Sequence, residues 1–293
     1  MSEIPCYCGS KSGELLRRKI RGGKSREIIR CDGCGTVRKR IRSAGDHEAF
    51  HRESGQSAEI DLDPNSEEYK ERNLIDIDRR KRAMQRFLND DTVLLDFGTG
   101  MGEFLDVIED EVGKSIGCEI NDQQADFVRN QLGIPVFEDL EDVVSAIGAD
   151  SVDILTMFHV LEHLVHPLKY LEDFHHVLDE DGVLIIEVPN HDDWLLAASD
   201  AYAQFYYQDA HSYYFDPDTL KDLVEMAGYR VDIVPVQRYG FKNALHWIRT
   251  GEPELEKPSR HDPDGSVVSR IYEKAVVSSM RSDTLFAICR PDQ

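Results

Sequence analysis

Residues 93–103 read VLLDFGTGMGE, an apolar run followed by three glycines at alternate positions. The apolar run predicts a buried strand, and the glycines predict a turn at which the backbone can approach a ligand closely. A helix that begins beyond such a turn directs unpaired N–H groups towards a bound molecule. In the dinucleotide turn the third glycine comes one residue later, so nicotinamide binding is the less favoured alternative.

Strands and helices alternate from residue 91 onward. The strand-like runs are apolar almost throughout, which is typical of a parallel sheet covered on both faces. The sequence therefore predicts an α/β fold, a Rossmann-like doubly wound sheet of seven strands. The expected strands are 92–97, 114–120, 134–137, 152–158, 182–188, 230–236 and 284–290. The expected helices are 64–89, 102–110, 122–132, 139–147, 167–178, 217–227 and 266–280.

The N-terminal segment differs in composition from the rest of the chain. It contains two cysteine pairs, Cys6 with Cys8 and Cys31 with Cys34. Four thiolates are typical of a closed structural zinc site, and a disulfide pair is the weaker alternative in a reducing compartment. We therefore expect a zinc-ribbon-like module at 1–42, a linker and helical lead-in at 43–91, and the α/β domain at 92–293.

Charge is distributed unevenly along the chain. The net charge is −22, and residues 1–45 hold 12 Lys and Arg against 4 Asp and Glu, so subtracting +8 from −22 leaves −30 for the remainder. Such an acidic body repels nucleic acid, which makes nucleic acid a disfavoured partner, whereas the basic N-terminus attracts anions. No apolar run approaches the length of a membrane span and no leader is recognisable, so we expect a cytoplasmic protein.

The second predicted strand ends in an acid, Glu119. A carboxylate at that place in a doubly wound sheet binds the two hydroxyls of an adenosine ribose. Together with the glycine turn, it predicts a cofactor that contains adenosine.

The stretch from about Thr92 to Arg290 resembles the class I S-adenosylmethionine (SAM)-dependent methyltransferases. The resemblance is carried by the motifs LLDFGTGMGEF, GCEIN, VFEDLED, VDILTMFHVLEHLVHPLKYLEDFHHVLDEDGVLIIEVPN and HSYYFDPDTLKDLVEMAGY. It implies methyl transfer from SAM and a role for each matching residue. Asp96 would orient the glycine loop and the methionine amino group, Gly98, Gly100 and Gly102 would pack against the amino-acid part of SAM, Glu119 would hold the ribose, and Asp139 with Leu140 would flank the adenine.

Three polar residues follow the strand predicted at 152–158: His159, Glu162 and His163. If a helix begins there, they share one face, and the carboxyl end of a parallel strand faces the ligand crevice. His211 lies downstream. Three imidazoles and a carboxylate suit general-base catalysis on a hydroxyl or a divalent metal such as Mn, Fe or Zn, and a purely structural role is the third alternative.

Two related groups of enzymes carry a Glu-x-x-Glu-His run at the same place, with metal bound. They are the ubiquinone-pathway O-methyltransferases and the small-RNA 3′-end 2′-O-methyltransferases, and the RNA enzymes add a later histidine. Here His159 replaces the first glutamate of that run.

The segment 236–247 mixes aromatic residues with Arg238, Lys242 and Asn243. It resembles a segment of bacterial methyltransferases from surface-polysaccharide and modified-sugar pathways, many of which begin with a similar ribbon. This resemblance implies a small sugar-like or nucleotide-sugar acceptor, methylated on oxygen or alternatively on carbon. Two other functions stay open: an RNA methyltransferase that uses the basic N-terminus, and a non-catalytic SAM-binding protein.

Overall fold

The computed structural model describes residues 3–45, 49, 51–52, 67–253 and 267–292. A seven-stranded sheet forms its centre, in the order β10-β11-β8-β7-β4-β5-β6. Its strands are β4 (Val93–Phe97), β5 (Lys114–Cys118), β6 (Val136–Phe137), β7 (Val152–Phe158), β8 (Leu178–Pro189), β10 (Tyr229–Val236) and β11 (Thr284–Pro291). Each predicted strand overlaps one of these, so the expected seven-stranded Rossmann-like fold is confirmed.

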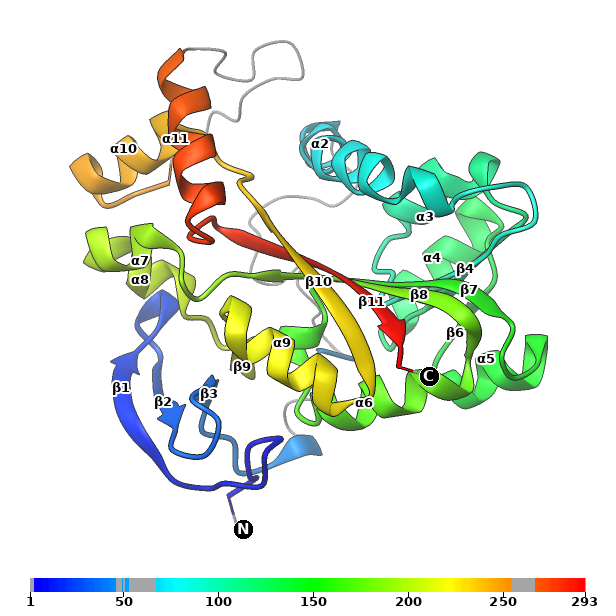
Figure 1. The fold of residues 1–293 in the computed structure, drawn as a ribbon, viewed down its shortest axis with the longest axis horizontal. Helices are drawn as coiled ribbons and strands as arrows, with labels where there is room; N and C mark the ends of the chain where they lie inside the picture. Colours follow the sequence, from blue (N-terminus) through cyan, green and yellow to red (C-terminus); the bar gives the residue numbers. More distant parts are fainter. Residues whose placement is uncertain (1–2, 46–48, 50, 53–66, 254–266, 293) are drawn as a thin grey trace.

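Helices cover both faces of this sheet (Figure 1). Consecutive residues of a strand point to opposite faces, so Leu94 and Leu95 on β4 belong to different hydrophobic clusters. Leu94 packs in the cluster with α2 (Glu67–Met84), α3 (Glu103–Ile108) and α4 (Asp122–Phe127). Leu95 packs in the cluster with α5 (Leu140–Ile147), α6 (Pro167–Asp173) and α9 (Pro217–Met226). The strands are therefore buried on both sides, as their unbroken apolar runs indicate.

One strand departs from the parallel arrangement that the alternation of strands and helices indicates. β4 pairs in parallel with β5 and β7, but β11 runs antiparallel to both β8 and β10. An apolar run shows that a strand is buried, but it does not determine the strand's direction. The sheet is therefore mixed.

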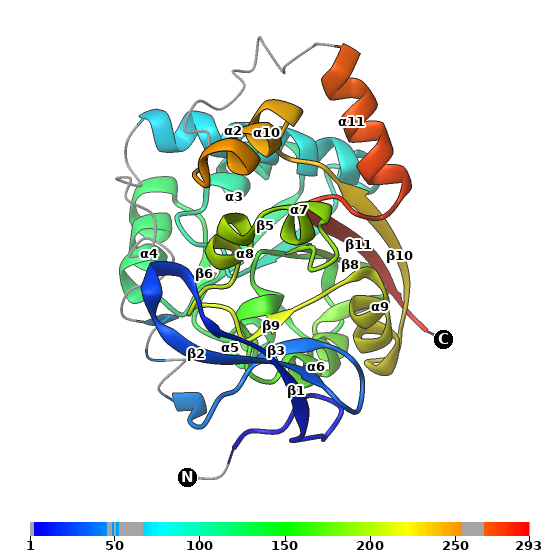
Figure 2. The same cartoon turned by 90° about the vertical axis from the view of Figure 1, so that its left-hand side faces the viewer.

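A second, four-stranded antiparallel sheet contains the N-terminal segment (Figure 2). Its strands are β1 (Gly13–Lys19), β2 (Ser25–Cys31), β3 (Val37–Lys39) and β9 (Tyr213–Tyr214). β9 comes from the α/β domain, so the N-terminal module completes its sheet with a strand from the body of the protein.

Four more helices lie near the carboxyl ends of β8 and β10: α7 (Trp194–Ala198), α8 (Asp200–Tyr206), α10 (Phe241–Thr250) and α11 (Val267–Ser278). Most of the linker predicted within 43–63, the start of the helix predicted at 64–89 and Ser266 lie outside the described residues. Within the described part of the chain, no helix is both long and apolar enough to cross a bilayer.

Candidate functional site

The glycine turn follows β4 directly, and its geometry requires glycine. Gly98, Gly100 and Gly102 all have positive φ, between 58° and 79°. A Cβ atom on Gly98 would lie 2.4 Å from Cγ2 of Val160, and one on Gly102 would lie 2.8 Å from Cδ1 of Leu132. A larger residue would therefore be strained at all three positions and would clash at positions 98 and 102, so the predicted turn requires glycine.

Asp96 lies at the end of β4, just before this turn, and is only 4% exposed. Its Oδ1 accepts a hydrogen bond of 2.6 Å from the hydroxyl of Thr156 on β7. Burial raises the pKa of Asp96, and the hydrogen bond from Thr156 opposes that rise. The carboxylate thus ties the ends of two neighbouring central strands together beside the glycine turn.

Glu119 follows β5 and faces the same turn. Its Oε2 accepts a hydrogen bond of 2.8 Å from the backbone N–H of Gly100, and its Oε1 accepts one of 2.8 Å from Asn121. Desolvation raises the pKa of this buried carboxyl group. A carboxylate oxygen has two lone pairs, so both oxygens keep the capacity to accept a ribose hydroxyl.

Asp139 and Leu140, the residues expected beside adenine, come after β6, the strand next to β5. The backbone N–H of Glu119 donates to the carbonyl of Phe137 at 2.9 Å, so the two strand ends meet. Asp139 caps α5 by accepting a hydrogen bond from the Asp142 N–H. The residues predicted to contact SAM therefore lie along one carboxyl edge, at the ends of β4, β5 and β6.

The segment after β7 does not form the regular helix that would place His159, Glu162 and His163 on one face. His159 has a φ of 58°, and only a short 3-10 turn, Leu161–His163, follows it. The side chain of His159 lies between two carboxylates. Its Nδ1 lies 3.3 Å from Oε1 of Glu162, and its Nε2 lies 3.0 Å from Oε1 of Glu187. Burial alone would lower the pKa of His159, but the two carboxylates outweigh it and raise that pKa.

Glu187 was missed by the sequence analysis, although it is a lone charge in the apolar run of β8. It is fully buried and receives hydrogen bonds from Arg79 at 2.8 Å and Arg80 at 2.9 Å, both on α2. Burial would raise its pKa, but Arg80, His159 and Arg79 hold it well below the usual value. Arg238 contacts His159 at 3.1 Å and forms an ion pair with Asp76.

Glu162, which contacts His159, also groups with His163 and His211 in what is called here the histidine cluster. One nitrogen or oxygen atom from each lies within 4.8 Å of the others, and all three residues are buried. The Oε2 of Glu162 and the Nδ1 of His211 have no hydrogen-bond partner among the described residues. Burial, reinforced by His163, lowers the pKa of His211 well below its ordinary value. Three of the four predicted polar residues thus come together in the cluster, and His159 lies between Glu162 of the cluster and Glu187.

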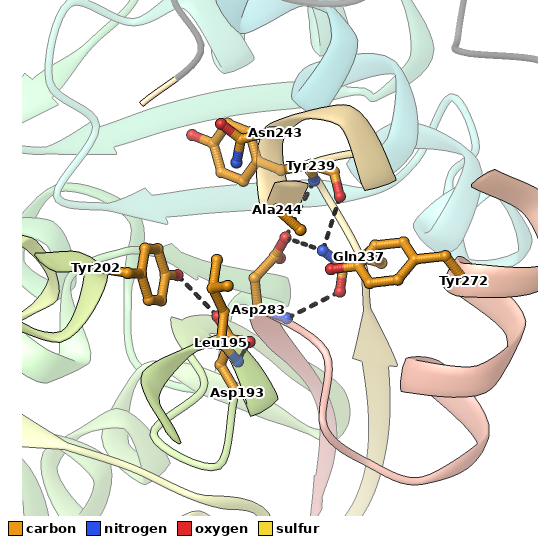
Figure 3. A pocket seen from close by; sticks show the side chains of 9 residues that line it. All are labelled: Asp193, Leu195, Tyr202, Gln237, Tyr239, Asn243, Ala244, Tyr272 and Asp283. Carbon is orange, nitrogen blue, oxygen red and sulfur yellow. Dashed lines mark hydrogen bonds between the residues drawn. The ribbon is translucent and has the colours of Figure 1, made fainter. Parts of the chain in front are cut away.

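A small polar pocket lies between the ends of β8 and β10 and helices α10 and α11 (Figure 3). Tyr202 donates to Asp193 at 2.7 Å, and Gln237 donates to Asp283 at 2.6 Å. Burial and the neighbouring Asp283 raise the pKa of Asp193 to about 7. Four of the nine lining residues come from the segment 236–247. The full lining is Asp193, Leu195, Tyr202, Gln237, Tyr239, Asn243, Ala244, Tyr272 and Asp283.

The four N-terminal cysteines lie together as free thiols. Sγ atoms are 3.6 Å apart for Cys6 and Cys34 and 3.5 Å apart for Cys8 and Cys31, too far for a disulfide. Four sulfurs held about 2.3 Å from a central ion in a tetrahedron are separated by about 3.8 Å, so the donor set fits zinc.

Comparison with solved structures supports the same fold. The chain is similar to a SAM-dependent methyltransferase from Archaeoglobus fulgidus, with 22% identity, a TM-score of 0.51, and coverage of 75% of this chain and 94% of that one. It is similar to a chain in the complex of the Haloferax volcanii Trm112 methyltransferase activator with a putative methyltransferase, with 13% identity, a TM-score of 0.52 and coverage of 86% and 100%.

A third similar structure is phosphoethanolamine N-methyltransferase 2 of Haemonchus contortus in complex with SAM, with 14% identity, a TM-score of 0.51 and coverage of 86% of this chain and 61% of that one. No curated protein matches the sequence. Residues 67–233, more than half of the chain, match the family described as "Methyltransferase domain". The chain therefore belongs to this family and is a SAM-dependent methyltransferase.

Proposed function

We propose that the protein transfers the methyl group of SAM to a hydroxyl oxygen of a small sugar-like or nucleotide-sugar acceptor. The observation that carries this proposal is the contact between Gly98 of the glycine turn and Val160, which lies two residues before Glu162 of the histidine cluster. A hydroxyl that attacks a methyl group must lose its proton, and a base held next to the cofactor can take it.

The residues at the ends of β4, β5 and β6 would bind SAM, which supplies an electrophilic methyl group. Glu119 would accept the two ribose hydroxyls, Asp96 would orient the turn and the methionine amino group, and Gly98, Gly100 and Gly102 would give access to the backbone. Asp139 and Leu140 would flank the adenine. The supporting observation is that all of them lie on one edge of the sheet.

His163 would act as the proton acceptor, beside a neutral His211 whose Nε2 accepts a hydrogen bond from the Gln208 amide. The Nδ1–H of His163 donates to the carbonyl of Ala210 at 3.0 Å, so the neutral ring carries its lone pair on Nε2. The lowered pKa of His211 keeps that ring neutral at pH 7. His159, whose pKa is raised between two carboxylates, would position Glu162 instead of accepting a proton. Two imidazoles and one carboxylate also suit a divalent ion such as Mn, Fe or Zn, which is the alternative for this cluster.

The resemblance of the segment 236–247 to sugar-pathway methyltransferases supports a sugar-like acceptor. The polar pocket formed by this segment has a free volume of only about 10 Å³, enough for one water molecule, so it does not itself hold a sugar. Arg238 connects this pocket to the histidine cluster, because its backbone N–H donates to Asp283 and its side chain contacts His159. The RNA alternative has less support. Arg26 and Lys24, in the basic N-terminal hairpin, pair with Asp209, and Arg21 donates to the carbonyl of Phe205.

The first experiment offers SAM with a radioactive methyl group and a panel of nucleotide sugars, with transfer RNA and ribosomal RNA as parallel arms. We expect methylation of a nucleotide sugar and none of RNA, and the variants His163→Ala and Glu162→Gln should lose it. Methylated RNA would establish the alternative. SAM binding without transfer in any arm would contradict the proposed acceptor class. Loss of activity with a chelator, restored by added Mn²⁺ or Mg²⁺, would assign a metal to the cluster.

The second experiment concerns zinc in the four-cysteine cluster. We expect about one zinc ion per chain in freshly purified, reduced protein, and its loss in Cys31→Ser. Cys289→Ser, which changes a buried cysteine outside the cluster, is the matched control and should keep the metal. Elemental analysis that finds no metal in the wild-type protein would refute the zinc site.

A further inference from the structure

We propose that the N-terminal four-cysteine module is a positioning part of the acceptor site, and that Asp209 is the residue through which it acts. The module would hold the loop 205–214 in place, and with it the two histidines of the cluster. The catalytic consequence rests on the proposed function of those histidines, whereas the structural consequence does not.

Backbone hydrogen bonds join the module to both ends of this loop. At its start, the N–H of Arg21 donates to the carbonyl of Tyr207 at 2.7 Å. At its end, β3 pairs with β9, and the N–H of Lys39 donates to the carbonyl of Ser212 at 2.9 Å. The loop is therefore continuous with the sheet of the module, and its path depends on that sheet being formed.

Between these ends, Asp209 receives three basic side chains from the module. Arg26 donates to both carboxylate oxygens, at 2.7 and 2.8 Å, in the bidentate geometry that gives strong ion pairs. The ammonium group of Lys39, whose side chain is only 7% exposed, lies 3.3 Å from Oδ1, and that of Lys24 lies 3.5 Å from Oδ2. A buried ammonium group needs a counter-charge, so Lys39 and Asp209 depend on each other.

The residues immediately before and after Asp209 in the sequence each form a hydrogen bond with one histidine of the cluster. The side-chain amide of Gln208 lies 2.7 Å from Nε2 of His211, and the carbonyl of Ala210 accepts from Nδ1 of His163 at 3.0 Å. A shift of Asp209 would therefore displace both partners, and with them both rings. The cofactor edge is built from β4, β5 and β6, and the loop 205–214 contributes none of those strands.

The test compares two arginines of the same hairpin in the full-length protein. Arg26→Ala breaks the pair with Asp209, whereas Arg18→Ala removes an equal charge from an exposed pair with Glu27. We expect Arg26→Ala and Asp209→Asn to speed hydrogen exchange of the amides of residues 207–214 and to leave the affinity for SAM, measured by calorimetry, unchanged. Turnover with the nucleotide sugar that the wild type methylates should fall about 10²-fold, the effect of a misplacement of about 1 Å. Arg18→Ala should match the wild type in all three measurements.

A double-mutant cycle then separates positioning from general weakening of the fold. If Asp209 acts through His211, Asp209→Asn should add little to the loss caused by His211→Ala. Fully additive losses, or unchanged exchange in both Arg26→Ala and Asp209→Asn, would overturn the proposal. Wild-type turnover in His211→Ala would refute the catalytic role of that histidine instead, and the exchange measurements would still decide whether the module holds the loop.

Discussion

The two halves of the carboxyl edge are built in different ways. The cofactor half, at the ends of β4, β5 and β6, depends on neighbours in sequence: a glycine turn and one acid two residues before it, with a second acid at the next strand end. The acceptor half, at the ends of β7 and β8, depends on residues far apart in sequence, such as His163 with Ala210 and His159 with Glu187. The half proposed to bind the cofactor is locally encoded, and the half proposed to select the acceptor is assembled by the tertiary fold.

The prediction with the largest expected effect tests whether the cofactor half and the acceptor half act independently. His163→Ala should lower turnover about 10²- to 10⁴-fold, the usual loss for a general base, and should leave SAM affinity unchanged. The measurement combines steady-state kinetics on the methylated acceptor with calorimetry for SAM. His166→Ala is the matched control, because that histidine is exposed and lies outside the cluster. Equal losses in SAM affinity and turnover would show that the two halves are not separate.

The second prediction concerns the cofactor half, where a substitution should lower SAM affinity and not turnover. Glu119→Ala should weaken SAM binding by on the order of 2–4 kcal/mol, because a carboxylate that accepts two ribose hydroxyls makes charge-assisted bonds. Turnover at saturating SAM should change much less. Calorimetry with SAM and with its demethylated product checks this, and Glu172→Ala, exposed on α6, serves as the control. Wild-type affinity in Glu119→Ala would remove this residue from the cofactor site.

The same contrast explains what the sequence alone could predict. The strands, the glycine turn and the acid Glu119 follow from local patterns, because burial periodicity and turn chemistry act over a few residues. The left-handed backbone of His159 and its bond to Glu187 depend on strand β8, and the two-residue strand β9 exists only because β3 pairs with it. Apolar periodicity carries no information about such long-range partners.

The acceptor half also contains a buried carboxyl group that should make stability depend on pH. Burial and Asp283 raise the pKa of Asp193 to about 7, from an ordinary value of 3.8, while Arg281 and the bonds from Leu195 and Tyr202 oppose the rise. The folded state therefore keeps a proton that the unfolded state loses near 3.8. The stabilisation that results from the raised pKa is fully present below pH 3.8 and is lost as the pH rises towards about 7.

Asp193→Asn should remove this dependence and keep the helix cap on Leu195. Between about pH 5 and pH 7 the free energy of unfolding of the wild type should fall by about 2 kcal/mol more than that of the variant. Chemical denaturation at the two pH values measures the difference. Asp192→Asn, which changes the exposed neighbour, should behave like the wild type. Parallel curves for wild type and Asp193→Asn would show that this carboxyl group is ionised in the fold.

The prediction with the smallest expected effect concerns the contact between the two halves, which Gly98 and Val160 form. Gly98→Ala places a methyl group at a φ of 77°, which costs about 1–2 kcal/mol for a residue with a side chain, and 2.4 Å from Val160 in the acceptor half. Val160→Ala relieves the contact but not the backbone strain, so the double variant should recover only the part that belongs to the contact. We expect a coupling of about 1 kcal/mol in the free energy of unfolding, measured by a double-mutant cycle. A coupling near zero would mean that Val160 moves aside freely, and the segment that carries Glu162 and His163 would then not be held in place by the glycine turn.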